Sequence, residues 1–244
     1  MILNIHAGHN PDGRTACGAI GIIRESTEAR RVKDEVISQL KQLGHTVYDC
    51  TCENGKNQTD VLQKIVAACN AHTVDLDVSI HFNSGAKDLT GNGATTGTEA
   101  WIYSASGRAR KYAEDICKSI SGEGFRNRGV RVNPGLYVLK HTKAPAVLVE
   151  CCFVDDRDDA ERYDCQKMAS AIVYGITGQR IPKAPGASET PGIPDEEKTP
   201  AGNETAIYRV QEIRQYGAFS DRANAERLCA RLRATGTDAV IVKA

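Results

Sequence analysis

Short apolar runs rich in β-branched residues alternate along the chain with longer segments in which apolar residues recur at helical spacing. The runs predict strands and the periodic segments predict helices. The predicted strands are "ILNIH" (2–6), "HTVYDC" (45–50), "LDVSIHF" (76–82), "TEAWIY" (98–103) and "AVLVE" (146–150). The predicted helices lie near residues 26–43, 58–72, 108–121 and 165–178. This alternation predicts an α/β fold, in which helices flank a mostly parallel, twisted sheet.

The pattern also predicts how the elements are covered. The first predicted helix carries Val and Leu at helical spacing and is followed by Gly44, a residue type that commonly ends helices. The runs "LDVSI" and "AVLVE" read as apolar on both faces. Strands of this kind are typical of sheets with helices on both sides.

Proline content marks a boundary in the chain. Residues 181–205 hold five of the eight prolines and almost no large apolar residue, which is typical of a flexible linker. The linker separates a block with the size of a catalytic domain, residues 1–180, from residues 206–244. In this last segment the pattern predicts strand, helix and strand, so we expect a small C-terminal βαβ unit.

Composition excludes some classes of partner. Lys and Arg total 31 and Asp and Glu total 31, so the overall charge indicates neither nucleic acid nor an anionic membrane surface. A hydrophobic content of 41% is enough for a globular core. Since no apolar run approaches the ~18 residues of a membrane span, we expect no membrane insertion.

The cysteines and the first residues indicate a cytoplasmic environment. The nine cysteines are odd in number and follow no zinc-ribbon spacing, and Cys151 and Cys152 are adjacent. We therefore expect reduced thiols that pack as small apolar residues, rather than a disulfide framework. The opening "MILNIHAGHN" lacks the basic and apolar regions of a signal peptide, which predicts synthesis in the cytoplasm.

Polar residues follow three of the predicted strands where each strand ends. The first strand runs out into His9, the third into His81 and Asn83, and the late strand into Glu150. Because the carboxyl ends of parallel strands meet at one edge of a sheet, we expect these side chains to lie close together.

Two histidines and a carboxylate form a common catalytic ligand set for Zn²⁺, which leaves one coordination position open for water. Glu25 lies at the start of the first predicted helix, near the loop that carries His9, and Glu150 closes the late strand. A carboxylate that is not a ligand can act as general base and acid. The H-E-x-x-H motif of zincins is absent from the sequence.

Five stretches, in the same order, resemble the zinc-dependent N-acetylmuramoyl-L-alanine amidases, and most closely the short, leaderless versions found in phage endolysins. They are "NIHAGHN" (4–10), "RES" (24–26), "SIHFN" (79–83), "TGTEAWIY" (96–103) and "LYVLKHTKAPAVLVECCF" (136–153). The resemblance covers roughly residues 1–178.

The resemblance implies that His9, Glu25 and His81 bind Zn²⁺ and that Glu150 is catalytic. It implies hydrolysis of the amide between N-acetylmuramic acid and the L-alanine of the peptidoglycan stem peptide, with no organic cofactor. It also implies an endolysin that is made in the host cytoplasm and acts at the bacterial cell wall after release by another factor.

Two positions near the expected ligands leave alternatives. His6 gives "HAGH" where many family members have "DAGH", and we interpret it as a neighbour of the site, because a fourth protein ligand would occupy the position that water needs. Glu28 is near enough to Glu25 in the sequence to compete with it as the carboxylate ligand.

Other functions were weighed against the amidase. One is a non-catalytic protein that binds the cell wall, and another is a peptidase that cuts within the stem peptide. A cysteine hydrolase would use Cys151 or Cys152, but both continue an apolar strand, so we interpret them as packing residues.

Charged side chains outside the ligand set have weaker patterns. Arg128, Arg131 and Lys140 are candidates to line the substrate groove, where they would suit the carboxylates of a stem peptide. The acidic run "DDRDDAER" (155–162) is interpreted as a solvated turn and helix start.

The C-terminal segment resembles one half of a SPOR peptidoglycan-binding domain, in "YRVQ", "GAFSDRANAERL" and "RLRATGTDAVIV". A single βαβ unit of this size is too small to hold a core alone. We therefore expect a homodimer through this unit, and a monomer at micromolar concentration would contradict it. The alternatives are glycan binding, which the resemblance implies, and a docking tail with no affinity for the wall.

Overall fold

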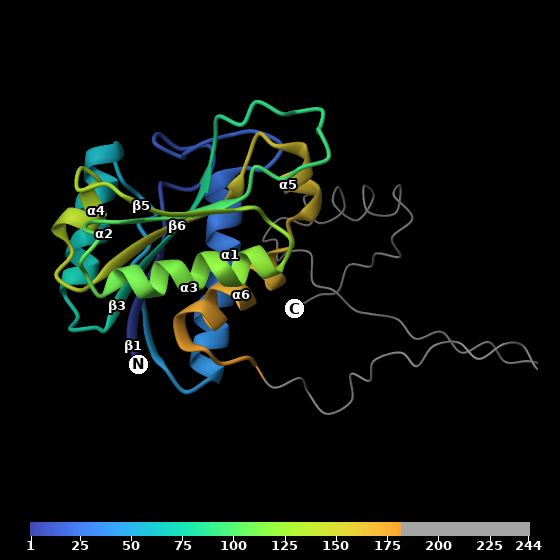
Figure 1. Ribbon diagram of the computed structural model, residues 1–244. Coiled ribbons are helices and arrows are strands. Elements are labelled where there is room, and N and C mark those ends of the chain that lie inside the picture. Colours follow the sequence, from blue (N-terminus) through green and yellow to red (C-terminus); the bar gives the residue numbers. More distant parts are fainter. Residues whose placement is uncertain (182–244) are drawn as a thin grey trace, which may run out of the picture. The chain divides into compact units, whose positions relative to one another are not determined.

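A six-stranded sheet runs through residues 1–181, the part of the chain that the computed structural model describes (Figure 1). Its strands are β1 (Ile2–Ala7), β2 (Thr46–Asp49), β3 (Leu76–Asn83), β4 (Thr98–Ile102), β5 (Asn127–Val132) and β6 (Ala146–Phe153). The strand order is β2-β1-β3-β6-β4-β5. β4 runs antiparallel to β6, and every other neighbouring pair is parallel. The prediction of an α/β fold with a mostly parallel sheet is confirmed.

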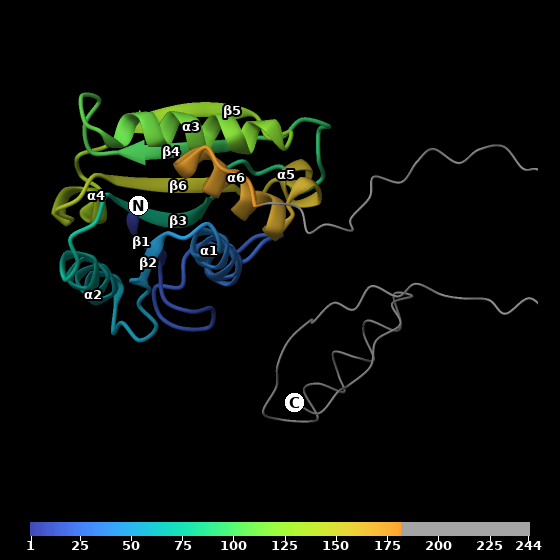
Figure 2. The same cartoon turned by 90° about the horizontal axis from the view of Figure 1, so that it is seen from below.

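Six helices cover the two faces of this sheet (Figure 2). They are α1 (Glu25–Gln42), α2 (Gln58–Asn70), α3 (Ala109–Gly122), α4 (Tyr137–His141), α5 (Arg157–Arg162) and α6 (Cys165–Thr177). α1, α3 and α6 pack on one face, whereas α2 and α4 lie on the other. The sequence pattern missed β5 and α4, which are short or carry few apolar residues.

The predicted linker and C-terminal unit lie outside the described residues, apart from Ile181 at the start of the linker. The proposed domain boundaries, the SPOR resemblance and the homodimer therefore stay predictions.

The face of the sheet toward α1, α3 and α6 is apolar because the side chains of a strand alternate between its two faces. Leu3 and Ile5 of β1 and Val78 and Ile80 of β3 are all fully buried there. With Ile172 of α6, they belong to a core that continues across the sheet. Burial of this apolar surface is the main favourable contribution to folding.

The opposite face of the sheet is buried but polar at its centre, which differs from the prediction that "LDVSI" is apolar on both sides. Asp77 and Ser79 alternate with the apolar residues of β3, and both are 2% exposed. Asn4 Nδ2 donates to Asp77 Oδ1 over 2.6 Å, and Ser79 Oγ lies 3.4 Å from His6 Nδ1. These hydrogen bonds offset the cost of burying polar groups.

The acidic run after β6 starts a helix as predicted, but the prediction that it is solvated is wrong. Asp156 and Asp159 are fully buried. Four carboxylates of the run accept hydrogen bonds from backbone N–H groups in the segment that joins β3 to β4. Asp155 binds Gly85, Ala86 and Lys87, Asp158 binds Asn92 and Gly93, Asp156 binds Thr96, and Asp159 binds Gly97. These charge-assisted bonds hold a long loop at the carboxyl end of β3.

The cysteines of residues 1–181 number eight, all with free thiols, and six of them are buried. They pack as small apolar residues, as predicted from the sequence.

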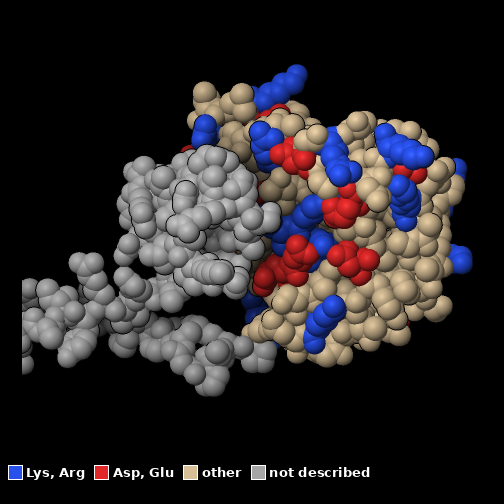
Figure 3. Space-filling view, turned by 180° about the vertical axis from the view of Figure 1, so that it is seen from behind, with Lys and Arg blue, Asp and Glu red and all other residues tan. Residues whose placement is uncertain are grey.

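On the face shown in Figure 3, Lys and Arg side chains lie interspersed with Asp and Glu. Among residues 1–181, no helix has both the length and the hydropathy that crossing a membrane requires.

We predict that Asp156→Ala destabilises the fold. Asp156 caps α5 by accepting from the N–H of Asp159 over 2.9 Å, and it accepts from both the N–H and the hydroxyl of Thr96. Losing this cap and the partner of a buried donor should lower the free energy of unfolding by about 2 kcal/mol. Urea denaturation followed by circular dichroism measures this change.

Asp115→Ala is the matched control, since Asp115 makes only an exposed ion pair with Lys111 on α3. We expect it to change the free energy of unfolding by less than about 0.5 kcal/mol. Equal effects of the two substitutions would contradict a holding role for Asp156.

Candidate metal centre

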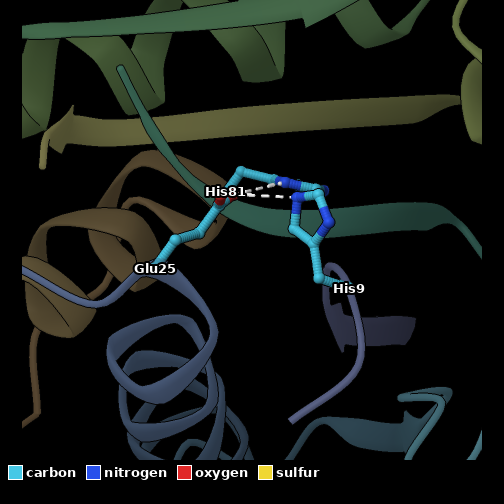
Figure 4. A group of neighbouring side chains, drawn as sticks. All are labelled: His9, Glu25 and His81. Carbon is cyan, nitrogen blue, oxygen red and sulfur yellow. Dashed lines mark hydrogen bonds and ion pairs between the residues drawn. The ribbon is translucent and has the colours of Figure 1, made fainter. Parts of the chain in front are cut away.

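The structure brings together His9, Glu25 and His81, which are far apart in the sequence (Figure 4). His9 lies in the loop after β1, Glu25 is the first residue of α1, and His81 lies near the end of β3. Glu25 Oε1 is 3.1 Å from His9 Nε2 and 2.9 Å from His81 Nδ1. One ligand atom from each residue lies within 4.8 Å of the other two.

Backbone N–H groups fix the carboxylate of Glu25 at the centre of this group. Ala19 donates to Oε2 over 2.7 Å, and Phe82 donates to Oε1 over 3.3 Å. Glu25 is 4% exposed, and its place in the first turn of α1 suits a negative charge near the positive end of the helix dipole. The side chain is thus oriented before any ligand arrives.

Two glycines leave the space that the three side chains occupy. A Cβ on Gly8 would overlap the ring of His81. A Cβ on Gly18 would crowd the Glu25 carboxylate and the His9 ring, and Gly18 also has a φ of +81°, which disfavours other residues. The sequence reading did not identify either glycine as part of the site.

The loop that carries His9 is held in a strained conformation by Arg30 of α1. His9 has a φ of 63°, in the left-handed region, which costs an ordinary residue roughly 1–2 kcal/mol. The guanidinium of Arg30 donates to the carbonyl of His9 over 3.0 Å and to the carbonyl of Cys52 over 2.9 Å. These bonds tie the loop to α1 and to the segment that follows β2, and so offset the strain.

The protonation of the group suits cation binding. Burial favours a raised pKa for Glu25, but hydrogen bonds from His81 and His9 and their nearby positive charge outweigh it and hold the pKa well below its usual range. Burial lowers the pKa of His81, and the charge of His9 acts in the same direction, although Glu25 opposes both. The ionised Glu25 carboxylate and the tendency of His81 toward its neutral form both favour coordination of a metal ion.

The residues present fit Zn²⁺. Two histidines and one carboxylate are a known ligand set of catalytic zinc sites, and two ligand atoms on a tetrahedral ion are ~3.4 Å apart. The separations of 2.9 and 3.1 Å lie close to that value before any adjustment for a bound ion. His9 is the most accessible of the three side chains at 24%, so the group is open on one side.

Glu150 of β6 lies beside this group, because its Cα pairs in register with that of His81. Its Oε2 atom is buried and has no hydrogen-bond partner among residues 1–181. Burial raises the pKa of Glu150 to about 8, and the negative charges of Glu25 and Glu99 act in the same direction. A buried carboxyl with a perturbed pKa beside a ligand group is suited to proton transfer.

Glu99 is a site neighbour that sequence reasoning missed. It lies at the start of β4 and pairs in register with Glu150. The rule that polar site residues lie at the carboxyl ends of parallel strands does not reach Glu99, because β4 is antiparallel to β6 and brings its amino end to the same edge. The polar residue at the start of the run "TEAWIY" was the available signal.

Glu28 and His6, the two alternatives that the sequence left near the ligands, both lie outside the ligand group. Glu28 points away from the group, since it accepts from Tyr163 Oη over 2.9 Å and pairs with Arg31. His6 is 1% exposed and lines a cavity of about 30 Å³ that His9 and His81 also line. Burial and the nearby His81 lower the pKa of His6 to about 3, so it is neutral at physiological pH. His6 is therefore a neighbour of the group, not a member.

Cys151 and Cys152 follow Glu150 but do not offer a nucleophile. Both are fully buried within the apolar core. Burial raises the pKa of each thiol well above its usual range, which opposes formation of the reactive thiolate.

Comparison with known proteins agrees with this geometry. The family model for N-acetylmuramoyl-L-alanine amidase (Amidase_3) matches residues 3–178. The chain belongs to this amidase family. The His9, Glu25 and His81 group is consistent with the metal site typical of the family's zinc enzymes.

Several curated proteins are similar to this amidase-family chain. N-acetylmuramoyl-L-alanine amidase CwlM of Bacillus licheniformis is 30% identical over 188 residues, which cover 76% of this chain and 64% of CwlM. An uncharacterized protein of Clostridium perfringens (strain 13 / Type A) is 37% identical over 164 residues, or 67% of this chain. This chain spans about half the length of that protein (47%) and of a second one from Clostridium perfringens (49%).

Two solved structures share the fold. The catalytic domain of CwlV, an N-acetylmuramoyl-L-alanine amidase from Bacillus (Paenibacillus) polymyxa var. colistinus, superposes with a TM-score of 0.59 at 25% identity, covering 73% of this chain and 97% of that domain. The catalytic domain of the CD27L endolysin superposes with a TM-score of 0.66 at 24% identity, covering 74% and 99%. At this identity, the similarity to the CD27L domain shows a shared fold and nothing further.

We predict that Gly8→Ala in this amidase-family protein weakens Zn²⁺ binding, because the added methyl group displaces the His81 ring. The loss should be roughly ten- to hundredfold in affinity, the range seen when groups that orient metal ligands are removed. Competition with a chromophoric chelator measures the affinity. Gly122→Ala on α3 is the control, because its Cβ would meet nothing within 4 Å, and unchanged affinity for Gly8→Ala would refute the steric argument.

Proposed function

We propose that this chain hydrolyses the amide bond between the lactyl group of N-acetylmuramic acid and the L-alanine of the peptidoglycan stem peptide, with Zn²⁺ held by His9, Glu25 and His81. The observation that carries the proposal is the convergence of these three ligand atoms within 4.8 Å, with Glu150 in register on the next strand, in a chain of the amidase family.

Zn²⁺ held by His9, Glu25 and His81 would activate water for attack and polarise the carbonyl of the scissile amide. Glu150 receives a proton from the attacking water while the water oxygen bonds to the carbonyl carbon. It then delivers this proton to the nitrogen of L-alanine as the carbon–nitrogen bond breaks. The products are a lactyl carboxylate and a peptide with a free L-alanine amino group.

The environment of Glu150 suits both steps. Its pKa of about 8 reflects burial and the charges of Glu25 and Glu99. A Zn²⁺ ion bound to Glu25 would offset the negative charge of Glu25, which is one cause of the raised pKa. It would therefore favour the ionised form of Glu150, which can accept a proton. A group whose pKa lies near the working pH can then give the proton up again.

The proposal predicts different defects for Glu150→Gln and His9→Ala. Glu150→Gln should keep its zinc but lose about 10²- to 10⁴-fold in rate, because only the proton carrier is removed. His9→Ala should lose both zinc and activity, because a ligand is removed. Purified peptidoglycan is digested with each protein, zinc is measured by atomic absorption, and the new termini are identified by mass spectrometry.

His6→Ala is the control and should keep most of its zinc. Release of peptides that begin with L-alanine supports the amidase. A cut inside the peptide would instead indicate a peptidase, and a zinc-loaded wild type that cuts nothing would indicate a non-catalytic protein that binds the wall. Full activity of Glu150→Gln would refute its assigned role.

We further propose that the enzyme is an endolysin that acts at the bacterial cell wall after release from the cytoplasm. The support is the endolysin of Bacillus phage SPP1, which is 28% identical over 168 residues and matches 64% of this chain. Bacterial amidases match as well, so the similarity alone supports the reaction more strongly than the lytic role. Two further predictions concern the C-terminal unit: that it binds glycan, and that it forms a homodimer.

The lytic role predicts that the protein lyses cells only when it reaches the wall. Induced expression in a host with a susceptible wall should leave culture turbidity unchanged until the membrane is permeabilised, and turbidity should then fall for the wild type but not for Glu150→Gln. No fall on permeabilisation, with purified peptidoglycan still digested, would contradict the lytic role and leave the reaction intact.

A further inference from the structure

Two arginines surround a buried glutamate one strand beyond Glu150. Arg128 Nε donates to Glu99 Oε2 over 2.7 Å, and Arg131 Nε lies 3.7 Å from the same oxygen. The other carboxylate oxygen, Oε1, accepts from Asn83 Nδ2 over 3.0 Å. Glu99 is 3% exposed, so this cluster is built around a side chain that solvent scarcely reaches.

The cluster has more guanidinium donors than Glu99 alone can use, although Arg128 also interacts electrostatically with Asp159. Two guanidinium groups face one carboxylate, and within residues 1–181 Glu99 is the only ion-pair partner of either arginine. The Arg131 side chain is 48% exposed and that of Arg128 is 26% exposed, so N–H donors that Glu99 does not use remain accessible. A guanidinium has five donors in a fixed fork, a geometry that matches a carboxylate.

Packing holds one of these groups rigidly. The guanidinium of Arg128 lies over the ring of Phe153, 4.9 Å from its centroid, and its Nε bonds Glu99. Removing Arg128 would leave Arg131 as the only, more distant ion-pair partner of Glu99 within residues 1–181. A buried charge without a close partner destabilises the fold. Arg131 is the freer of the two, with a single long contact to Glu99.

The distance from the cluster to the expected site of cleavage is short enough for the first residues of a bound stem peptide to span it. His81, Glu150 and Glu99 occupy paired positions on the three neighbouring strands β3, β6 and β4. Strands are ~4.8 Å apart, so the Glu99 backbone is about 10 Å from that of His81. Successive residues of a peptide are ~3.8 Å apart, so the residue after L-alanine can place a side group or backbone carboxylate within this span.

We propose that Arg131, supported by Arg128, binds a free carboxylate on the stem-peptide residue that follows L-alanine. This subsite rests on the proposed amidase function and adds a preference to it: the enzyme favours stem peptides in which that group is a carboxylate over those in which it is a carboxamide. Arg131 is then a specificity-determining residue, and Arg128 and Glu99 position it.

Of the three basic residues predicted to line the groove, Lys140 is separate from this cluster. It lies on α4 and takes part in no ion pair among residues 1–181. It therefore has no part in the proposed subsite.

The test compares two synthetic muramyl peptides that differ only in the carboxylate or carboxamide on the residue after L-alanine. The zinc-loaded wild type should show a kcat/KM at least about tenfold higher for the carboxylate, the size expected of one charge-assisted contact. Arg131→Gln should bring the two substrates to within about twofold, mainly through a higher KM for the carboxylate.

Arg110→Gln is the matched control, because Arg110 is also half exposed and pairs with one glutamate, Glu114, on α3. It should keep the wild-type preference. Arg131→Lys should restore part of the preference, since it keeps the charge without the fork. A purely structural role for Arg131 would lower the rate on both substrates equally and would overturn the subsite.

Binding separates failure of the subsite from failure of the amidase. Zinc-loaded Glu150→Gln is titrated with both peptides by calorimetry, and a second protein carries Arg131→Gln as well. If the carboxylate peptide binds more tightly and Arg131→Gln abolishes this difference, the subsite is supported, even if the wild type cuts neither peptide. Failure of the wild type to cut either peptide would refute the amidase alone. Equal binding of both peptides, with cleavage intact, overturns the subsite alone.

Discussion

The parallel pairing of β1, β3 and β6 is the constraint on which the site depends. It brings the loop after β1, the end of β3 and Glu150 of β6 to one edge of the sheet, so residues from distant parts of the sequence meet there. α1 then delivers Glu25 from its first turn, where a buried carboxylate is held by two backbone N–H groups. The ligand geometry thus follows from strand register before any side chain is considered.

Much of this could be predicted from the sequence, because buried strands and long amphipathic helices have strong local patterns. The polar ends of three predicted strands stood out against apolar runs, and they led to His9, His81 and Glu150, although β6 itself continues beyond Glu150 to Phe153. Glu25 needed the family resemblance, since spacing alone did not separate it from Glu28. The structure separates them by partner: Glu25 meets the two histidines, whereas Glu28 meets Tyr163 and Arg31.

What the sequence hid depends on contacts between distant segments. The acidic run after β6 has the composition of a solvated turn, and only the fold shows that its carboxylates accept backbone N–H groups of the loop from β3 to β4. Glu99 was missed because the direction of a strand is not a local property. Arg30 was missed because it holds the His9 loop through backbone carbonyl groups, which every residue carries.

The antiparallel contact between β6 and β4 divides the sheet into two parts with separate tasks. The residues that converge on Glu25 come from β1, β3 and α1, whereas the Glu99 cluster comes mostly from β4 and β5, which α3 connects. Only one strand pairing joins the two parts of the sheet. The outer strand β5 can therefore vary without disturbing the residues that would hold the ion, whereas α3 cannot, because its buried face shares the core with α6 and the central strands.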